Sequence, residues 1–241
     1  MIRGFSWLQF AAVLCTRLMH AVAYSSPELI ARKAQFRLLA ARCNRGFQAS
    51  PATTGALRTM AENLEATAAS DADAESFIPT SSPLLLGRWF LDFTDASDVL
   101  SLALLPAAEI GDIFQEVKPR EGITDRFVVD NAVELLAVGS GALGALTGVK
   151  VAGRYSVEGA CKTLSPTRVS LAFVGGRFQP LSSPFSLPAA SLSLPDAIAS
   201  PLQDALAERV YLETTFLDED MRIARGPGRE LYVLSKHEDS E

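Results

Sequence analysis

The chain has 241 residues, with 28 acidic and 22 basic side chains, a net charge of −6 and 48% hydrophobic residues. Length and composition indicate one globular domain, or one domain with an appendage, and exclude a wholly disordered or collagen-like chain. The negative charge argues against a nucleic-acid-binding protein, which needs clustered lysine and arginine. Residues 1–48 nevertheless carry seven basic side chains and one acidic one. A basic leader therefore precedes an acidic body.

Residues 1–24 are predicted to form a targeting leader. Arg3 precedes an apolar run from Gly4 to Cys15, and the small-residue pattern Ala21-Val22-Ala23 follows. This order is typical of a secretory signal peptide. An organelle transit peptide is the alternative, because the first 27 residues contain arginine and no acid. No stretch of the chain reaches the ~18 apolar residues of a membrane span.

Residues 25–83 are predicted to form a helical region and a linker. Ser26-Pro27-Glu28 supplies an N-cap, a first-turn proline and an acid, and Asn44-Arg45-Gly46 supplies a helix end. A second helix is expected from Ser50-Pro51 into the acidic stretch 71–75. Residues 70–83, which are rich in serine, threonine and proline, read as the linker.

Residues 84–236 are predicted to form an antiparallel β-barrel, followed by a charged tail at 237–241. Short β-rich runs alternate with turn residues, and no helical stretch of 10 to 15 residues separates them. Residues 180–201 hold five prolines and are expected to be a loop or an interrupted edge strand. The predicted strands are Arg88–Thr94, Val99–Leu104, Ile110–Lys118, Thr124–Val129, Ala132–Val138, Val149–Glu158, Arg168–Val174, Val210–Phe216, Met221–Arg225 and Glu230–Leu234.

Motifs for chemistry are few. Residues 139–144 match G-x-G-x-x-G, but strand-like sequence resumes at Val149, which leaves no room for the helix of a dinucleotide site, so a loop is expected. The two histidines lie near the chain ends, and the three cysteines are far apart, so neither a catalytic pair nor a metal site is predicted. Asp218-Glu219-Asp220 reads as a solvated turn, with paired catalytic carboxylates or a cation site as alternatives.

Gly87-Arg88-Trp89 opens the first predicted strand. A G-x-W at this place is typical of lipocalin-type barrels, in which the tryptophan closes one end and a late arginine packs across it. Arg222 and Arg225 are predicted to supply that cation–π contact. The alternative is that Trp89 is an ordinary core aromatic.

Several longer runs resemble the plastid lipid-associated protein, or fibrillin, family. They are Gly87 to Thr94, Ile110 to Gln115 with Asn131 downstream, Gly153 to Val157, Leu212 to Gly226, and Leu231 to Leu234. The resemblance extends upstream to Asn44-Arg45-Gly46 and covers about residues 28–235. It implies a lipocalin-like barrel behind a short helical region, in a plastid, at plastoglobules or thylakoids. It also implies binding or storage of carotenoids, tocopherols or prenylquinones, and a photoprotective role.

The leading hypothesis is a non-catalytic protein that binds a prenyl lipid or pigment, without a cofactor or metal. Basic residues of the first helix, at positions 32, 33, 37 and 42, are expected to meet anionic headgroups, or else to form a solvated face. The candidate residues for lining or closing the barrel, for which core packing is the alternative, are Trp89, Phe90, Phe127, Val129, Tyr155, Phe173, Phe216, Arg222 and Arg225.

Two rival hypotheses remain. A structural coat or scaffold would have a packed barrel and no ligand, and would hold a protein partner in a plastid complex. A lipid-modifying enzyme would need a catalytic group, and the best candidates are Asp218 and Asp220 beside Arg222.

Overall fold

The computed structural model describes residues 26–71, 79–105, 108–119, 126–137, 152–182, 189–193 and 209–236. The predicted leader, the loop at 139–144 and both histidines lie outside these ranges. Two helices come first, α2 (Pro27–Arg42) and α3 (Pro51–Asp71), joined through the 3-10 turn η1 (Asn44–Gly46). Ser26 caps α2 as predicted, because its Oγ accepts a hydrogen bond from Leu29 N at 3.2 Å. None of the described helices combines the length and the apolar character needed to cross a membrane.

The described residues form one sheet of nine antiparallel strands, eight of which close into a barrel. The order is β4-β3-β2-β1-β9-β8-β7-β5-β6; pairing of β4 with β5 closes the ring, and β6 lies on the edge of β5. The predicted lipocalin-like barrel behind a helical region is therefore confirmed. The strands are β1 (Gly87–Thr94), β2 (Ala108–Pro119), β3 (Arg126–Ala137), β4 (Ala152–Thr163), β5 (Arg168–Ser182), β6 (Ala190–Ser193), β7 (Tyr211–Leu217), β8 (Met221–Arg225) and β9 (Leu231–Lys236).

The secondary structure corrects two predictions. Val99–Leu104 is not a strand, because the helix α4 (Ser97–Leu100) and the 3-10 turn η4 (Ser101–Leu104) occupy it. A short apolar run does not distinguish helix from strand by its periodicity. The predicted break between two strands at Asp130-Asn131 is also wrong. β3 continues through it, and Asn131 pairs with Gln115 on one side and Val157 on the other.

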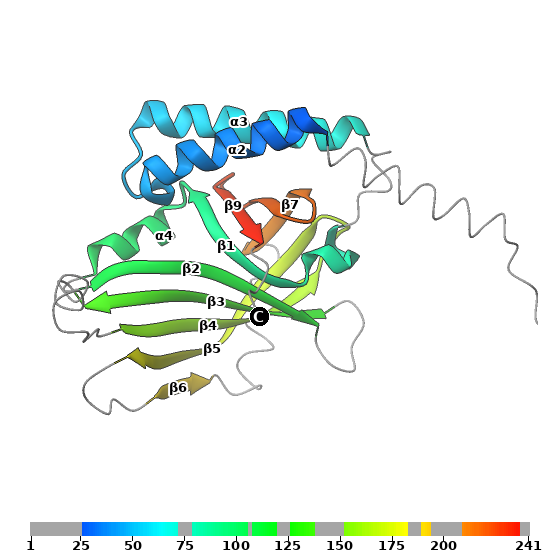
Figure 1. Cartoon of the computed structure of the whole chain (residues 1–241). Coiled ribbons are helices and arrows are strands. Elements are labelled where there is room, and N and C mark those ends of the chain that lie inside the picture. The colour runs from blue at the N-terminus through cyan, green and yellow to red at the C-terminus, as the bar shows by residue number, and fades with distance from the viewer. Residues whose placement is uncertain are drawn as a thin grey trace, which may run out of the picture.

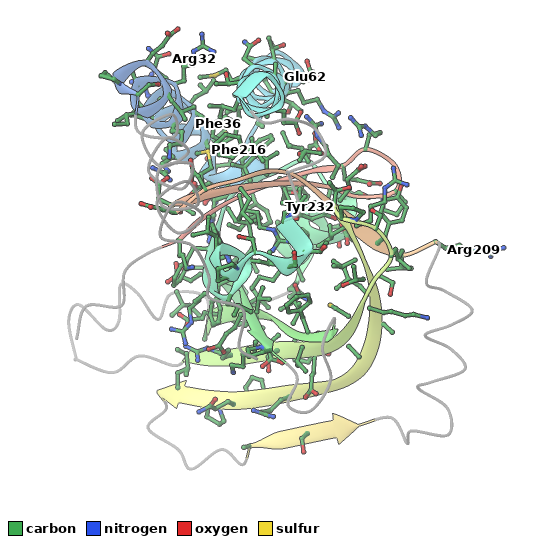
Figure 2. All side chains as sticks on the ribbon, turned by 90° about the vertical axis from the view of Figure 1, so that its right-hand side faces the viewer. Arg32, Phe36, Glu62, Arg209, Phe216 and Tyr232 are labelled. Carbon is green, nitrogen blue, oxygen red and sulfur yellow. The ribbon has the colours of Figure 1, made fainter. Side chains whose placement is uncertain are left out.

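The helices α2 and α3 lie side by side over one wall of the barrel, outside β1, β9 and β7 (Figure 1). Phe36 of α2 meets Phe93 of β1 edge to face, with ring centroids 6.1 Å apart, and points toward Phe216 (Figure 2). This layer buries β8 on both faces. The buried residues between helices and barrel are Leu29, Phe36, Ala40, Cys43, Leu57, Ala61, Leu64, Phe93, Phe216, Met221, Ile223, Leu231 and Val233.

A second apolar cluster lies inside the barrel. The 3-10 turns η2 (Pro79–Ser81) and η3 (Pro83–Leu85) precede β1, and Leu85 joins this cluster. Trp89 Nε1 donates a hydrogen bond to Leu85 O at 2.8 Å, which fixes the turn against the lumen. The buried members are Leu85, Trp89, Leu91, Val117, Val129, Cys161, Val169, Leu212, Leu217, Ala224 and Leu234.

Candidate functional site

Trp89 is fully buried in the lumen, beside the turn that precedes β1. The cation over its ring is Lys236, whose Nζ lies 5.2 Å from the ring centroid. The prediction that Arg222 or Arg225 closes over the indole is therefore wrong, since both guanidinium groups bind elsewhere. Lys236 lies two residues beyond the inward-facing Leu234, so strand alternation predicts that its side chain also faces inward, toward Trp89. The lipocalin pattern instead predicts an arginine at this place.

Arg222 of β8 reaches across the lumen. Its Nη1 donates a hydrogen bond to Gln115 Oε1 at 2.8 Å, and its Nε donates to Thr214 Oγ1 at 3.3 Å. Gln115 Nε2 in turn donates to Asn131 Oδ1 at 2.7 Å. Because β9 and β1 separate β8 from β2 in the sheet, the bond from Arg222 to Gln115 joins opposite walls of the barrel.

Arg222 is also a buried cation, with a side chain 2% exposed. None of the ion pairs among the described residues involves it. Burial lowers its pKa to about 10, against the opposing effect of the nearby Cys161. Burial raises the pKa of the Cys161 thiol to about 12, so this thiol is protonated at neutral pH. A buried charge normally has an ionic partner. The lumen therefore contains a polar anchor that is suited to an oxygen atom of a bound molecule.

The predicted lining residues differ in where the structure places them. Trp89 and Val129 belong to the lumen cluster, and Phe127, which is partly buried, packs against it. Tyr155 pairs with Val133 in register, and its side chain is 42% exposed. The side chain of Phe173 lies outside those described. Whether any of these residues contacts a ligand stays a prediction.

Two predicted lining residues face away from the lumen. Phe216 packs under the helices, because the pairing of β7 with β8 shifts register between Thr214 and Phe216. Phe90 lies on the opposite face of β1 from Trp89, with its ring 5.5 Å from the ring of Phe114. The prediction that Phe90 and Phe216 line the barrel is therefore wrong.

The turn of Asp218 to Asp220 fastens α2 to the barrel. Asp218 is 3% exposed, accepts hydrogen bonds from the backbone N–H groups of Asp220 and Met221, and binds Lys33 Nζ at 2.8 Å. Lys33 also binds Asp220, which pairs with Arg37 at 3.0 Å. The solvated-turn prediction is wrong for Asp218. The lysine ammonium lies against these carboxylates, on the outer side of the barrel from the Arg222 guanidinium, so they do not form an acid pair beside that arginine.

The two aspartates differ electrostatically. Burial raises the pKa of Asp218, which outweighs the opposing charge of Lys33. Burial also acts to raise the pKa of Asp220, but hydrogen bonds from Lys33 and Asp218 and the charges of Lys33 and Arg37 lower it to about 2. Asp220 is therefore the member whose ionised form stabilises the contact between helix and barrel.

The basic face predicted for the first helix is largely directed to the protein itself. Lys33 and Arg37 bind the aspartates of the β7–β8 turn, and Arg32 pairs with Glu28 one helical turn away at 2.7 Å. Figure 2 shows Arg32 on the outer side of the helices. Of the four basic residues expected to meet headgroups, Lys33 and Arg37 are therefore corrected to a structural role.

Arg225 makes the corresponding contact with α3. Its Nε and Nη2 each donate to Glu65 at 2.9 Å, and Thr215 Oγ1 donates to Glu65 Oε1 at 2.6 Å. Arg225 is 2% exposed. The two arginines of β8 thus point to opposite faces, one into the lumen and one to the helices.

Comparisons with known proteins agree with this architecture. The sequence model of the PAP_fibrillin family matches residues 33–235. A probable plastid-lipid-associated protein 3, chloroplastic, of Oryza sativa subsp. japonica is 28% identical, over 79% of this chain and 54% of its own length. Plastoglobulin-1, chloroplastic, of Pisum sativum is 30% identical, over 70% of this chain and 53% of its own length. No solved structure matches.

The chain spans about half the length of these curated relatives. A third relative, from Arabidopsis thaliana, is likewise named a probable plastid-lipid-associated protein 3, chloroplastic, with 26% identity. The predicted plastid location agrees with all three names. Since the family match spans most of the chain and includes both the helical layer and the barrel, the chain belongs to the PAP_fibrillin family.

Proposed function

We propose that this protein is non-catalytic and that its barrel binds a prenyl lipid or pigment through an oxygen atom directed to Arg222. The observation that carries the proposal is a guanidinium 2% exposed, without a carboxylate partner among the described residues, inside an apolar lumen. Tocopherols, prenylquinones and oxygenated carotenoids have an oxygen-bearing head and a long apolar body. The geometry disfavours a pure hydrocarbon, which would leave the cation uncompensated.

Burial of the apolar body supplies the driving force. Each Å² of apolar surface removed from water contributes roughly 25 cal/mol, so several hundred Å² exceeds the cost of ordering the ligand. The inward side of β3 and β4 offers apolar surface for this purpose, since Val133 is buried there and Tyr155, its partner in register, is 42% exposed. The plastoglobule or thylakoid surface is the proposed site of action, with photoprotection as the expected role.

The test is extraction of lipids that copurify with the native protein, followed by mass spectrometry. Purified protein is then titrated with α-tocopherol, whose fluorescence reports binding. Arg222→Met, which keeps an unbranched chain but removes the charge, should weaken binding about tenfold, because a hydrogen bond to a charged group contributes about 1.5 to 3 kcal/mol. Arg154→Gln, on the outer face of β4, is the matched control. Equal affinity of both variants and the wild type would contradict the assignment of Arg222.

A structural coat or scaffold is the second candidate. It is favoured by the bond from Arg222 to Gln115, which braces the two walls without any ligand. In that case no lipid copurifies, α-tocopherol does not bind, and the protein still partitions onto lipid droplets or retains a protein partner of a plastid complex.

A further inference from the structure

A groove of about 630 Å³ lies outside the barrel, where the end of α2 and η1 meet β1 and β2. This volume is within the range of small-molecule sites. Its lining includes Arg37, Asn44, Arg45, Phe90, Asp92 and Asp112. Phe90 and Asp92 lie on the outer face of β1, on which the groove opens, and Leu91 and Ile113, which belong to or pack against the lumen cluster, form part of its floor.

One wall of the groove is a strained turn. Asn44, Arg45 and Gly46 have φ angles of 48°, 60° and 106°, three left-handed residues in succession. Gly46 is required there, because a Cβ atom would collide with Thr94 O. Asparagine tolerates this conformation, but for Arg45 it is costly, and such strain concentrates at binding sites. The turn brings both side chains to the groove.

The two guanidinium groups of the groove are held in place. Arg45 donates to Gly111 O at 2.6 Å and to Ile110 O at 3.3 Å, where the pairing of β2 with β3 is irregular. Arg37 is held by Asp220 and lies 3.5 Å from Asp92 Oδ2. The groove is therefore preorganised, which reduces the cost of binding.

The chemistry of the lining selects the ligand. Arg37 and Arg45 offset Asp92 and Asp112, so the groove has no net charge and offers donors beside acceptors. An anion would meet two carboxylates, and a cation would meet two guanidinium groups. Hydroxyl groups donate and accept equally well. We infer that the groove binds a neutral polyhydroxylated group, a sugar, whose apolar face lies against Phe90.

The position of the groove indicates that this sugar is a lipid headgroup. Ile30 and Leu38 of α2 are 54% and 57% exposed, and their spacing of eight residues places them on one side of the helix. Ala41, which is exposed and lines the groove, lies three residues beyond Leu38. When Ile30 and Leu38 enter a lipid surface, the groove opens beside that surface.

The experiment measures binding of the full chain to phosphatidylcholine vesicles with and without a monohexosyl diacylglycerol. We expect the glycolipid to tighten binding at least fivefold. Asn44→Gly removes the amide and suits the left-handed backbone, and Asp112→Asn removes an exposed charge at constant size. Each variant should lose most of the increase in affinity that the glycolipid causes, and should bind pure phosphatidylcholine vesicles as the wild type does. Asp130→Asn, on β3 away from the groove, is the control and should retain it.

Equal binding to the two vesicle types, or an increment that both groove variants retain, overturns the inference. If free methyl hexoside, at the same concentration as the lipid-bound sugar, displaces the protein from the glycolipid vesicles, the groove binds soluble sugars. That outcome overturns the inference that the sugar is a lipid headgroup. Binding of α-tocopherol to the same proteins is measured in parallel. Binding of α-tocopherol depends on Arg222 and not on the groove. Failure of the barrel proposal is therefore distinguishable from failure of the glycolipid proposal.

Discussion

The two walls of the barrel are unlike. Strands β7, β8 and β9 have five to seven residues and lie beneath the helices, and every residue of β8 is buried. Strands β2 to β5 have 12 to 15 residues, and their outer face carries a ladder of ion pairs that includes Lys118 with Asp130 and Arg154 with Glu134. We refer to them as the covered wall and the open wall.

The difference shows where the fold constrains the sequence most. On β8, at the centre of the covered wall, each polar side chain must have a buried partner, because neither face of that strand reaches water. Arg222 meets Gln115 inside the barrel, and Arg225 meets Glu65 outside it. On the open wall only the inner face carries this constraint. The longest run of family resemblance, residues 212–226, accordingly coincides with β7, β8 and the turn between them.

The largest expected effect is loss of packing on the covered wall. Phe216 is fully buried between β7 and the helices, so Phe216→Ala should lower the free energy of unfolding by about 3 to 5 kcal/mol. Tyr155→Ala, on the open wall, should cost less than about 1 kcal/mol, since that side chain is 42% exposed. Urea denaturation of both variants measures the difference. Comparable losses would mean that the two walls do not differ in packing.

The next effect concerns the ion cluster that holds α2. Lys33→Ala leaves Asp218 buried without its cation, so we expect a loss of about 3 kcal/mol in urea denaturation. A second variant tests the cause. Lys33→Met with Asp218→Asn removes both charges and keeps the acceptor for the turn, so most of the loss should be recovered. A double variant no more stable than Lys33→Ala would show that packing of the lysine stem, not charge, holds the helix.

Sequence alone predicted the parts of the fold that have local signals. The cap at Ser26, the helix end at Asn44-Arg45-Gly46 and the hairpins of the covered wall are all present. The sequence did not reveal that Asp218 is buried, because a run of three acids has the composition of a surface turn and Lys33 lies 185 residues away. Long-range partners of this kind have no signature in local pattern.

The candidate site was predictable only in part. Alternation from Val117 and Val129 places Gln115 and Asn131 inside the barrel, and both are among the residues that resemble the family. Phe216 does not follow this alternation, because a shift of register in β7 moves its side chain to the outer face of the barrel. The groove outside the barrel forms where the turn at residues 44–46 contacts the irregular pairing of β2 with β3. The periodicity of the sequence does not predict such a contact.

A smaller effect on the free energy of unfolding is expected when the pH is lowered. The pKa of Asp220 in the folded protein is about 2, below the unfolded value near 4. Its contribution to stability is therefore present above about pH 4 and lost as the pH falls toward 2. Because the side chain is 45% exposed, screening limits the loss to about 1 kcal/mol. The raised pKa of Asp218 acts in the opposite direction, and its effect lies at and above the unfolded pKa near 4. Wild type and Asp220→Asn, denatured by urea at pH 5 and pH 2.5, should differ less at the lower pH.

The smallest effect should come from the open wall. Arg154 pairs with Glu134 at 2.7 Å and lies 5.0 Å over the ring of Phe114, yet its side chain is 29% exposed. Water solvates both charges when either partner is removed, so Arg154→Gln should change the free energy of unfolding by less than about 0.5 kcal/mol. Arg225→Gln, an identical change on the covered wall, leaves Glu65 without its cation where solvent has little access, and should cost several times more. Similar urea midpoints for the two variants would mean that the helices leave water free access to the outer face of β8, and the contrast between the walls would fail.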